Sequence, residues 1–535
     1  MNYKGPIALI VMDGIGLADR EEGNAVKLAY TPMLDKLFAQ YPWVGIKAHG
    51  TAVGLPSDDD MGNSEVGHNA IGAGAVYSQG AKLVNESIES GKMYEAEGWK
   101  EIVANVQEKQ STLHFLGLFS DGNVHSHINH LTAMIRQAKA EGVKKVRVHI
   151  LLDGRDVGET SALEYVEPFE AFLQEVNDAA FDAKIASGGG RMNITMDRYE
   201  ADWSMVERGW NTHVLGEGRT FASAKEAIET YRKETGVIDQ DLPAFVIADD
   251  NGPVGKIVDG DSVVFFNFRG DRALEISRAF TDPDLNTFNR RTFPKVCYAG
   301  MLQYDGDLKI PERYLVNPPS ISNTMGELLA KKGFAQLAIA ETQKFGHVTY
   351  FWNGNKSGKF DDALETYVEV KSDVVPFEQR PWMKAAEVTD RLIEEIRTGK
   401  YQFVRVNFAN GDMVGHTGSM LAARVAVETV DICLSRLLPV LDEMGGMAII
   451  TADHGNADEM YEIKKGKVAT NPDGSPKAKT AHTLNPVPCI FYDNTDNKDQ
   501  YKIQEGSYGL SNLAASVAFL MGVDKPEAWD ASIIG

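Results

Sequence analysis

The residues best suited to chemistry in this chain are one serine and a scattered set of aspartates and histidines. Ser64 lies within residues 63–68 at a predicted helix start, where N–H groups and the helix dipole favour an anion. The accompanying carboxylates and imidazoles are Asp13, Asp412, His416, Asp453, His454 and His482. Such donors suit Mn²⁺, Mg²⁺, Co²⁺ or Zn²⁺ better than any metal selected by thiolates. Two close cations would activate the Ser64 hydroxyl and polarise a phosphoryl oxygen, so the set predicts a metal-activated nucleophile.

Each member of this set also has an ordinary structural interpretation. Ser64 alone would be a helix N-cap, Asp412 with His416 a solvated loop pair, and His482 a hydrogen-bonded histidine. Their occurrence together in one chain, each near a predicted strand end or helix start, favours the chemical interpretation.

Predicted strands stand before the aspartates of this set. Residues 7–12 lead to Asp13, residues 403–408 to Asp412, and residues 447–451 to Asp453. Short β-branched runs alternate with longer amphipathic stretches, such as a predicted helix over 27–40, which is typical of α/β proteins with a mostly parallel sheet. Ligands bind beyond the carboxyl ends of strands in such sheets, so we expect carboxylates from distant segments to meet there.

The middle of the chain repeats this arrangement with basic residues. Strands are predicted over 113–119, 146–152, 184–186 and 262–266, and polar loops follow them. These loops carry the candidate substrate-binding residues His125, Arg155, Asp156, Arg191, Arg198, Arg269 and Arg272. Arginine binds phosphate and carboxylate in bidentate fashion, and Asp156 could move protons for substrate hydroxyls. Lys344 lies outside this segment and could stabilise a phosphoryl group near Ser64.

The length of 535 residues exceeds one ordinary hydrophobic core, so two domains are expected. Candidate metal ligands occur before and after the middle segment, which makes an inserted domain the simplest arrangement. We therefore predict a doubly wound, mostly parallel α/β domain from residues 1–79 and 317–535, which holds the metals. The inserted α/β domain, residues 80–316, is expected to bind the substrate.

Charge and composition exclude several classes of protein. The net charge of −22 argues against broad contact with nucleic acid or anionic lipid, which need a surplus of Lys and Arg. No signal peptide and no apolar stretch of membrane-spanning length are evident. Three widely spaced cysteines without a CxxC pair indicate buried apolar residues in a reducing compartment. These features predict a cytoplasmic protein, which we expect to be a monomer acting on a small molecule.

With their flanking residues, these motifs resemble one family, the cofactor-independent phosphoglycerate mutases of the alkaline-phosphatase superfamily. The matching segments are 11–14, 64–69, 120–127, 153–156, 267–272, 340–344 and 451–456. The serine and metal motifs alone indicate only the superfamily, whereas the middle segments indicate the mutase. The resemblance extends over essentially the whole chain.

The resemblance implies an alkaline-phosphatase-like domain interrupted by a transferase domain, and interconversion of 2-phosphoglycerate and 3-phosphoglycerate without 2,3-bisphosphoglycerate. It implies two cations, commonly Mn²⁺, held by Asp13, Ser64, Asp453 and His454 and by Asp412, His416 and His482. Ser64 would accept the phosphoryl group as phosphoserine and return it to the other hydroxyl of the same glycerate. The substrate-site residues it implies are His125, Arg155, Asp156 as proton shuttle, Arg191, Arg198, Arg269, Arg272 and Lys344.

Two departures from the family pattern are visible. Arg191 and Arg198 are separated by one residue more than usual, so their alignment is open. The gap between His454 and His482 is longer than in compact members and holds a Lys-rich stretch, residues 464–479. We expect that stretch to be a surface loop that bulges outward and leaves His482 in place.

Other functions share parts of this pattern. A metal-dependent phosphomonoesterase or a sugar-phosphate mutase would use the same serine and metals. Neither function explains why the chain carries both the loop with Arg155 and Asp156 and the loop with Arg269 and Arg272. A catalytically inactive binding protein would not need every expected catalytic side chain. Dinucleotide binding is disfavoured because Asp19 occupies the place of the third glycine in the fingerprint, and no Walker A sequence is present.

Overall fold

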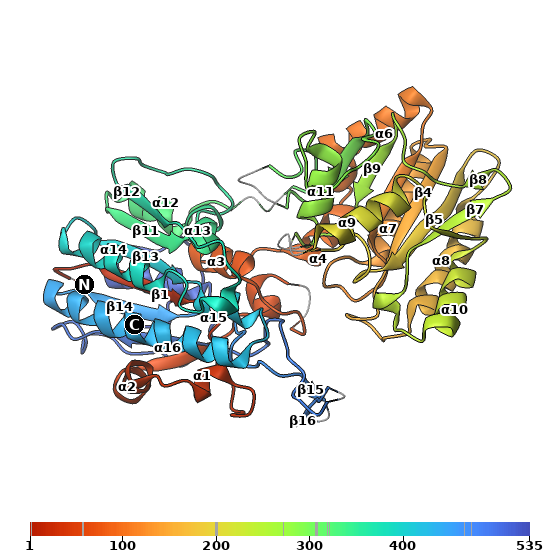
Figure 1. Cartoon of the computed structure of the whole chain (residues 1–535). Helices are drawn as coiled ribbons and strands as arrows, with labels where there is room; N and C mark the ends of the chain where they lie inside the picture. Colours follow the sequence, from red (N-terminus) through yellow and green to blue (C-terminus); the bar gives the residue numbers. More distant parts are fainter. Residues whose placement is uncertain are drawn as a thin grey trace. The chain divides into compact units, whose positions relative to one another are not determined.

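The computed structural model describes residues 1, 3–55, 58–197, 202–270, 272–304, 309–317, 319, 321–464, 466–471 and 473–535. The chain folds into two compact units, called here unit 1 (Met1–Gln79 with Pro319–Gly535) and unit 2 (Gly80–Pro318) (Figure 1). The predicted end of the inserted segment, residue 316, precedes the end of unit 2 by two residues.

A seven-stranded sheet forms the centre of unit 1. In spatial order its strands are β12 (Glu365–Val370), β11 (Gln336–Glu341), β13 (Phe403–Phe408), β1 (Ile7–Met12), β14 (Met447–Thr451), β17 (Val487–Tyr492) and β2 (Trp43–Ile46). The first five are parallel, whereas β17 runs antiparallel to both of its neighbours. Strands β1, β13 and β14 consist wholly of buried residues, as expected for parallel strands covered on both faces.

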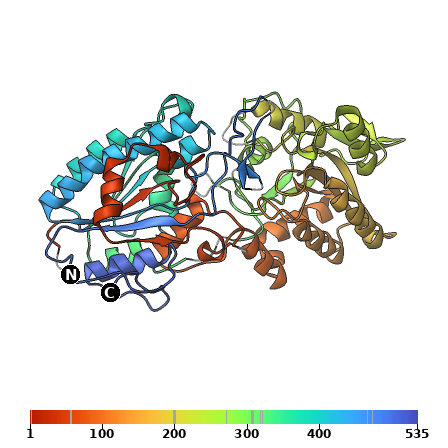
Figure 2. The ribbon, with the colours of Figure 1, turned by 90° about the horizontal axis from the view of Figure 1, so that it is seen from below.

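Helices cover both faces of this sheet. The α-helices of unit 1 are α1 (Ala25–Leu28), α2 (Pro32–Gln40), α3 (Ser64–Ala73), α12 (Met325–Lys331), α13 (Thr342–Gly346), α14 (Ala385–Arg397), α15 (Asn410–Gly415), α16 (Met420–Met444) and α17 (Asn512–Met521). Figure 2 shows α14 and α16, in teal and light blue, on one face and the dark-blue α17 on the other. This doubly wound arrangement confirms the predicted mostly parallel α/β fold.

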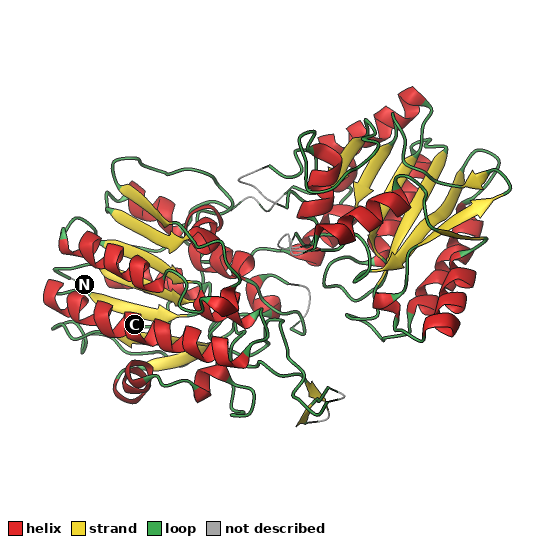
Figure 3. Cartoon of the chain, in the orientation of Figure 1, coloured by secondary structure: helices red, strands yellow, loops and turns green. Residues whose placement is uncertain are grey.

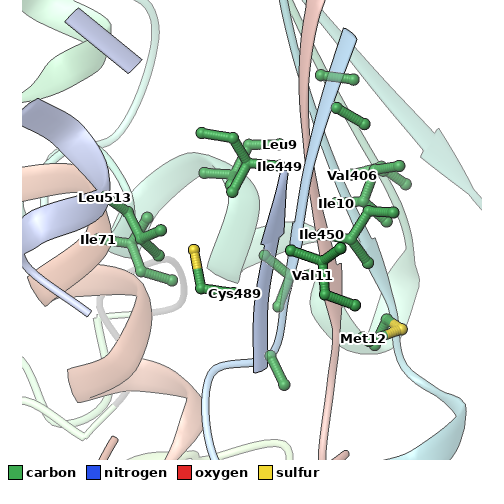
Figure 4. Packing of buried hydrophobic residues seen from close by; sticks show 14 of the residues in the cluster. Leu9, Ile10, Val11, Met12, Ile71, Val406, Ile449, Ile450, Cys489 and Leu513 are labelled. Atoms are coloured by element: carbon green, nitrogen blue, oxygen red, sulfur yellow. The ribbon is translucent and has the colours of Figure 1, made fainter. Parts of the chain in front are cut away.

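Alternate side chains of β1 pack on opposite faces of the sheet, because successive residues of a strand point in opposite directions. Leu9 lies on the same side as Ile71 of α3 and Leu513 of α17 (Figure 4). Ile10 lies on the other side, with Val406 of β13. Each fully buried aliphatic side chain of this kind contributes about 1.5–3 kcal/mol relative to its exposed state. The packed core thus holds the strand ends that carry the polar residues.

The single helix predicted over residues 27–40 is wrong. The structure has two helices, α1 and α2, and Pro32 is the first residue of α2. A proline has no N–H and clashes with the preceding turn, so it begins a helix rather than continuing one. Asp431 of α16 accepts hydrogen bonds from the N–H groups of Met33 and Leu34 at 3.2 and 2.7 Å, and so caps α2 from another part of the chain.

Unit 2 contains a second sheet. In spatial order its strands are β10 (Cys297–Gly300), β9 (Ser262–Phe265), β3 (Leu113–Leu118), β4 (Lys145–Leu152), β5 (Asp182–Gly190), β7 (Phe245–Asp249) and β6 (Arg219–Phe221), and β8 (Gly252–Pro253) pairs with β7. The strands from β10 to β5 are parallel. The α-helices are α4 (Gly80–Glu89), α5 (Lys92–Glu95), α6 (Glu97–Lys109), α7 (Ile128–Ala140), α8 (Ala162–Val176), α9 (Trp203–His213), α10 (Ala224–Thr235) and α11 (Leu274–Thr281) (Figure 3).

Two buried clusters lie on the two faces of this second sheet. One packs α6, α7 and α8 against the sheet, and the other packs α9 and α11. Strand β5 is longer than the predicted 184–186, because the glycines at its end belong to the strand rather than to a loop. A Cβ at Gly190 would lie 2.2 Å from the carbonyl oxygen of Gln240, so this close approach of two backbones requires glycine.

The Lys-rich stretch that was expected to be a surface loop contains a short hairpin. Its strands are β15 (Ile463–Lys464) and β16 (Lys467–Val468), and further bridges join Tyr461 to Ala478 and Thr470 to Pro476. Residues 465 and 472 of this stretch lie outside the described residues. Across the part of the chain that is described, no helix is both long and apolar enough to cross a membrane.

Candidate active site

Four neighbouring strands of unit 1 carry the predicted site residues just beyond their carboxyl ends. Strands β11, β13, β1 and β14 lie side by side, and Lys344, Asp412, Asp13 and Asp453 follow them in that order. Because the strands are parallel, these four side chains share one edge of the sheet. Segments about 400 residues apart in sequence therefore meet, as the strand pattern predicts.

Ser64 is the first residue of α3 and is free of the capping role. The N-cap is Asn63, whose side chain accepts a hydrogen bond from the N–H of Val66 at 3.0 Å. Ser64 Oγ lies instead 3.2 Å from Asp13 Oδ1 and 3.0 Å from His454 Nε2. The interpretation of Ser64 as an N-cap is therefore wrong, and its hydroxyl faces the predicted ligands.

Two facing histidines provide a test of whether a cation fits this site. His416 Nδ1 lies 2.7 Å from the carbonyl oxygen of Thr480, and His482 Nδ1 lies 2.7 Å from that of Gly62. Each Nδ1 donates to its carbonyl, which turns Nε2 toward the site, the orientation that a metal-binding histidine adopts. These two Nε2 atoms lie 3.0 Å apart, and each lies 3.1 Å from Asp412 Oδ1. Two imidazole nitrogens and a carboxylate oxygen that converge in this way fit a divalent cation.

A second acceptor cluster lies around Asp453. This residue is fully buried, and neither of its carboxylate oxygens accepts a hydrogen bond from any described residue. A buried carboxylate without donors is costly unless a cation compensates it. Asp13, Asp453 and His454 place ligand atoms within 4.8 Å of one another, as do Asp412, His454 and His482. His454 thus contributes to both groups, and the donor atoms fit two divalent cations.

Burial and charge set the protonation of these groups. Burial, followed by repulsion from Asp453, raises the pKa of Asp13 to about 6. Burial likewise raises the pKa of Asp453. Burial alone would raise the pKa of Asp412, but Lys344 and nearby histidines hold it well below its ordinary value. Burial lowers the pKa of His482 to about 3, which keeps its ring neutral and able to bind a metal.

Lys344 is the cation of the site. Its Nζ lies 2.6 Å from Ser64 Oγ, 2.8 Å from Asp412 Oδ2 and 3.1 Å from Asp13 Oδ2. Burial by itself disfavours the ammonium, yet attraction to the three buried aspartates raises the pKa of Lys344 above its ordinary value. Lys344 therefore stays charged and donates a hydrogen bond to the candidate nucleophile.

Sequence reasoning missed three supporting residues. Asn407 on β13 donates to Asp13 Oδ2 at 2.8 Å and lies 3.2 Å from His68 Nε2. His68 in turn lies 2.8 Å from the carbonyl oxygen of Ser64 through Nδ1, and burial lowers its pKa to about 4, so it is a neutral support. Asn456 donates to Asp412 Oδ1 at 2.9 Å. Strand β13 carries two polar residues, Arg405 and Asn407, and the position of Asn407 near its carboxyl end was the signal that could have identified it.

The loops of unit 2 bring most of the predicted substrate residues to one edge of the second sheet. Strands β9, β3, β4 and β5 are consecutive in that sheet, and the loops after them carry these residues. The N–H of Phe268 donates to the carbonyl oxygen of His125 at 2.7 Å, and Ser120 donates to Asp153 at 2.5 Å, so neighbouring loops are joined. Arg269 is half-buried in this group, and Arg155 is exposed with its Nη1 3.9 Å from Met192 Sδ.

Arg191 and Arg272 are fixed inside this group of loops. Arg191 is buried, and its Nη1 donates to Asp153 Oδ1 at 2.9 Å and to Asp156 Oδ2 at 2.5 Å. Arg272 is also buried, and its Nη1 donates to the carbonyl oxygen of Met196 at 2.6 Å. The predicted substrate residue Arg198 lies outside the described residues.

Comparisons with known proteins agree with this geometry. Residues 5–525 match the model of the metalloenzyme superfamily. The chain is 56% identical over 532 residues to a protein of Leptospira interrogans named as a probable 2,3-bisphosphoglycerate-independent phosphoglycerate mutase, covering 99% of this chain and 97% of that one. It is 49% identical to the 2,3-bisphosphoglycerate-independent phosphoglycerate mutase of Trypanosoma brucei, covering 99% and 97%. The chain belongs to this family of mutases.

A solved structure of the same family has the same fold. The phosphoglycerate mutase of Leishmania mexicana, crystallised at low cobalt concentration, is 47% identical to this chain. The comparison covers 100% of this chain and 98% of that one, with a TM-score of 0.81. Membership in the phosphoglycerate mutase family confirms the resemblance drawn from the motifs. The chain is a member of the metalloenzyme superfamily, and the structure contains two buried groups of His and Asp residues that suit metal ions.

Proposed function

We propose that this chain interconverts 2-phosphoglycerate and 3-phosphoglycerate by moving the phosphoryl group through Ser64, without 2,3-bisphosphoglycerate as a donor. The observation that carries the proposal is the surroundings of Ser64 Oγ. It lies at once beside a charged donor, Lys344, and two proposed metal ligands, Asp13 and His454. Full-length similarity to mutases of this kind supports the choice of substrate.

The first half-reaction transfers the phosphoryl group to the protein. Ser64 Oγ gives up its proton to solvent and attacks the phosphorus, and the bond between phosphorus and the substrate oxygen breaks. Lys344 is already within hydrogen-bond distance of Oγ and remains charged, so it stabilises the negative charge that spreads over the transferring group. The leaving glycerate oxygen takes up a proton, for which Asp156 is the proposed donor.

The second half-reaction reverses the first on the other hydroxyl of the same glycerate. That hydroxyl gives its proton to Asp156 and attacks phosphoserine, and Ser64 Oγ leaves and regains a proton. The proton count therefore closes over one turnover. We propose that the substrate is held by His125, Arg155, Arg191, Arg198, Arg269 and Arg272, and that unit 2 is the substrate-binding transferase domain.

Two cations belong to this proposal, with Mn²⁺ as the expected metal. We propose that Asp13, Ser64, Asp453 and His454 hold one and that Asp412, His416 and His482 hold the other. When bound, such cations polarise phosphoryl oxygens and favour the ionised form of a serine hydroxyl. We also propose that the chain acts as a monomer in the cytoplasm, where it serves glycolysis and gluconeogenesis.

A coupled assay on 3-phosphoglycerate tests the function. We expect 2-phosphoglycerate to form without release of inorganic phosphate and without any requirement for 2,3-bisphosphoglycerate. Free phosphate in place of 2-phosphoglycerate would instead identify a phosphomonoesterase, which would use the same serine and metals but lose the phosphoryl group to water.

Replacing Lys344 with methionine is expected to lower kcat by roughly 10²–10³-fold, as for the loss of a preorganised donor to a developing anion. Methionine keeps much of the side-chain volume and removes only the charge and the hydrogen bonds to Ser64 and Asp412. Steady-state kinetics with measured metal content would check this. Lys331→Met, which removes an exposed ion pair with Glu327, is the matched control and should leave kcat unchanged. Equal rates in the two variants would contradict the role given to Lys344.

The activity is expected to fall as the pH decreases through about 6, and added metal should move this fall to lower pH. The pKa of Asp13 is raised to about 6 by burial and by Asp453, so a proton occupies the carboxyl below that pH. Protons and cations compete for the same oxygens, hence metal affinity decreases as the pH falls. Rate profiles at a low and a saturating Mn²⁺ concentration would check this. Coincident profiles would contradict the competition.

A further inference from the structure

A continuous hydrogen-bonded chain of buried polar side chains crosses the second sheet on the face covered by α9 and α11. Its members, in order, are Asp261, His114, His149, Ser187, His213 and Thr195. The successive distances are 3.0, 2.9, 2.6, 2.7 and 3.0 Å. Every member is at most 2% exposed. A buried network of this size restricts side-chain positions strongly when all of its members are satisfied.

The carboxylate of Asp261, at one end of this hydrogen-bonded series, determines which atom of each pair donates. Asp261 accepts hydrogen bonds from the N–H groups of Thr112 and Val258, both at 2.9 Å, and His114 Nε2 must donate to it as well. Burial lowers the pKa of His114 and of His149, so both rings are neutral. The Nδ1 of His114 is then an acceptor, and the Nε2 of His149 donates to it.

The proton positions from His149 to Thr195 follow in turn. With its Nε2 protonated, His149 accepts at Nδ1 from the hydroxyl of Ser187, and that hydroxyl accepts from Nδ1 of His213. Burial lowers the pKa of His213 to about 3, so its Nε2 carries a lone pair. The hydroxyl of Thr195 must therefore donate to His213 Nε2, and one proton arrangement satisfies the whole chain.

Thr195 occupies a strained position that this hydrogen bond helps to hold. Its φ is +69°, in the left-handed region that β-branched residues rarely adopt. The N–H of Thr195 donates to the carbonyl oxygen of Met205 on α9 at 2.9 Å. A Cβ at Gly209 would lie 2.0 Å from Thr195 Oγ1, so α9 can approach this turn only with glycine there. Strain of this kind persists where the surroundings determine it, and it concentrates at functional sites.

The strained turn lies between Arg191 and Arg272, two buried arginines of unit 2. Arg191 stands at the start of the turn, with the N–H of Ile194 bonded to the carbonyl oxygen of Gly190 at 3.1 Å. Met196, directly after Thr195, offers the carbonyl oxygen that holds Arg272 Nη1 at 2.6 Å. A change in the conformation of Thr195 would move that oxygen and with it the Arg272 guanidinium.

We propose that His213 is a positioning residue for substrate binding, which acts through the hydroxyl of Thr195 on the turn that seats Arg191 and Arg272. This turn follows the carboxyl end of β5, and the buried hydrogen bonds connect it to Asp261, which directly precedes the amino end of β9. This inference rests on the proposed function, because it assumes that the two arginines bind the phosphoglycerate.

Thr195→Val tests the proposal, since it removes the hydroxyl and keeps the shape of the side chain. We expect KM for 3-phosphoglycerate to rise about tenfold or more and kcat to change by less than about threefold, because displaced binding groups weaken ground-state and transition-state binding alike. Thr195→Ser should restore wild-type KM. Thr212→Val on α9 is the matched control, because the hydroxyl of Thr212 donates to the carbonyl oxygen of Arg208 and not to a residue of the turn.

Two further measurements separate positioning from simple destabilisation. Thr195→Gly relieves the strain at φ +69° but also lacks the hydroxyl, so it should raise KM as Thr195→Val does, although its turn is no longer strained. Nitrogen NMR of the wild-type protein should show neutral rings protonated at Nε2 in His114 and His149 and at Nδ1 in His213. Wild-type KM in Thr195→Val, or the opposite tautomers, would overturn the proposal. The NMR result and calorimetric binding of 3-phosphoglycerate do not require turnover, so they distinguish this failure from failure of the proposed function.

Discussion

Ser64→Ala is expected to abolish interconversion of the phosphoglycerates, with a loss of roughly 10⁴-fold or more, as for other removed nucleophiles. The hydroxyl lies within 3.2 Å of Asp13, His454 and Lys344, and these groups can act on the phosphoryl group only if Oγ accepts it. Asn63 rather than Ser64 caps α3, so the substitution should leave the helix and the fold intact. A coupled assay with 3-phosphoglycerate measures the loss.

A serine at another helix start provides the control. Ser223 is the N-cap of α10 and accepts a hydrogen bond from the N–H of Glu226 at 3.1 Å. Ser223→Ala should lower stability by about 1 kcal/mol and leave the rate unchanged. Mass spectrometry of wild-type protein quenched during turnover should find phosphate on Ser64. Full activity in Ser64→Ala, or phosphate on another residue only, would contradict the serine mechanism.

Removing divalent metal is the second change with a large expected effect. Chelation should abolish activity, and Mn²⁺ should restore it, because the cations are proposed to activate Ser64 and the phosphoryl group. The free energy of unfolding should also fall, by about 2.7 kcal/mol for each site that metal had filled at a hundred times its Kd. The buried carboxylate of Asp453, whose oxygens accept no hydrogen bond from the described residues, is left uncompensated without a cation.

Calorimetric melting with and without chelator measures this stabilisation directly. Asp453→Asn removes one proposed ligand and should reduce the difference in Tm between the two conditions. Asp431→Asn is the matched control, since Asp431 is a buried carboxylate that caps α2 and should preserve the difference. Turnover in protein shown by elemental analysis to hold no metal, with an unchanged Tm, would contradict both the proposed ligands and the mechanism.

Local sequence patterns predicted the strand ends of the site well. The mostly apolar runs of five or six residues before Asp13 and Asp453 are buried strands in the structure, as their lack of an apolar–polar alternation indicated. The same reasoning failed for residues 27–40, where Pro32 outweighs the apolar periodicity, and for the end of β5, where Gly190 continues a strand. In both cases a backbone property decided the structure against the side-chain pattern.

The amino-acid sequence by itself determined the family, the α/β class and the candidate ligands, because motifs and strand alternation are properties of neighbouring residues. Tertiary structure decided which groups act together. Pairing of β1 with β13 brings Asn407 to Asp13. Ser64 and His454 are 390 positions apart in the sequence, and Ser64 Oγ lies 3.0 Å from His454 Nε2. The tautomers of buried histidines such as His213 likewise follow from partners on other elements. Distances and proton positions between remote segments depend on packing and strand register, which no local pattern encodes.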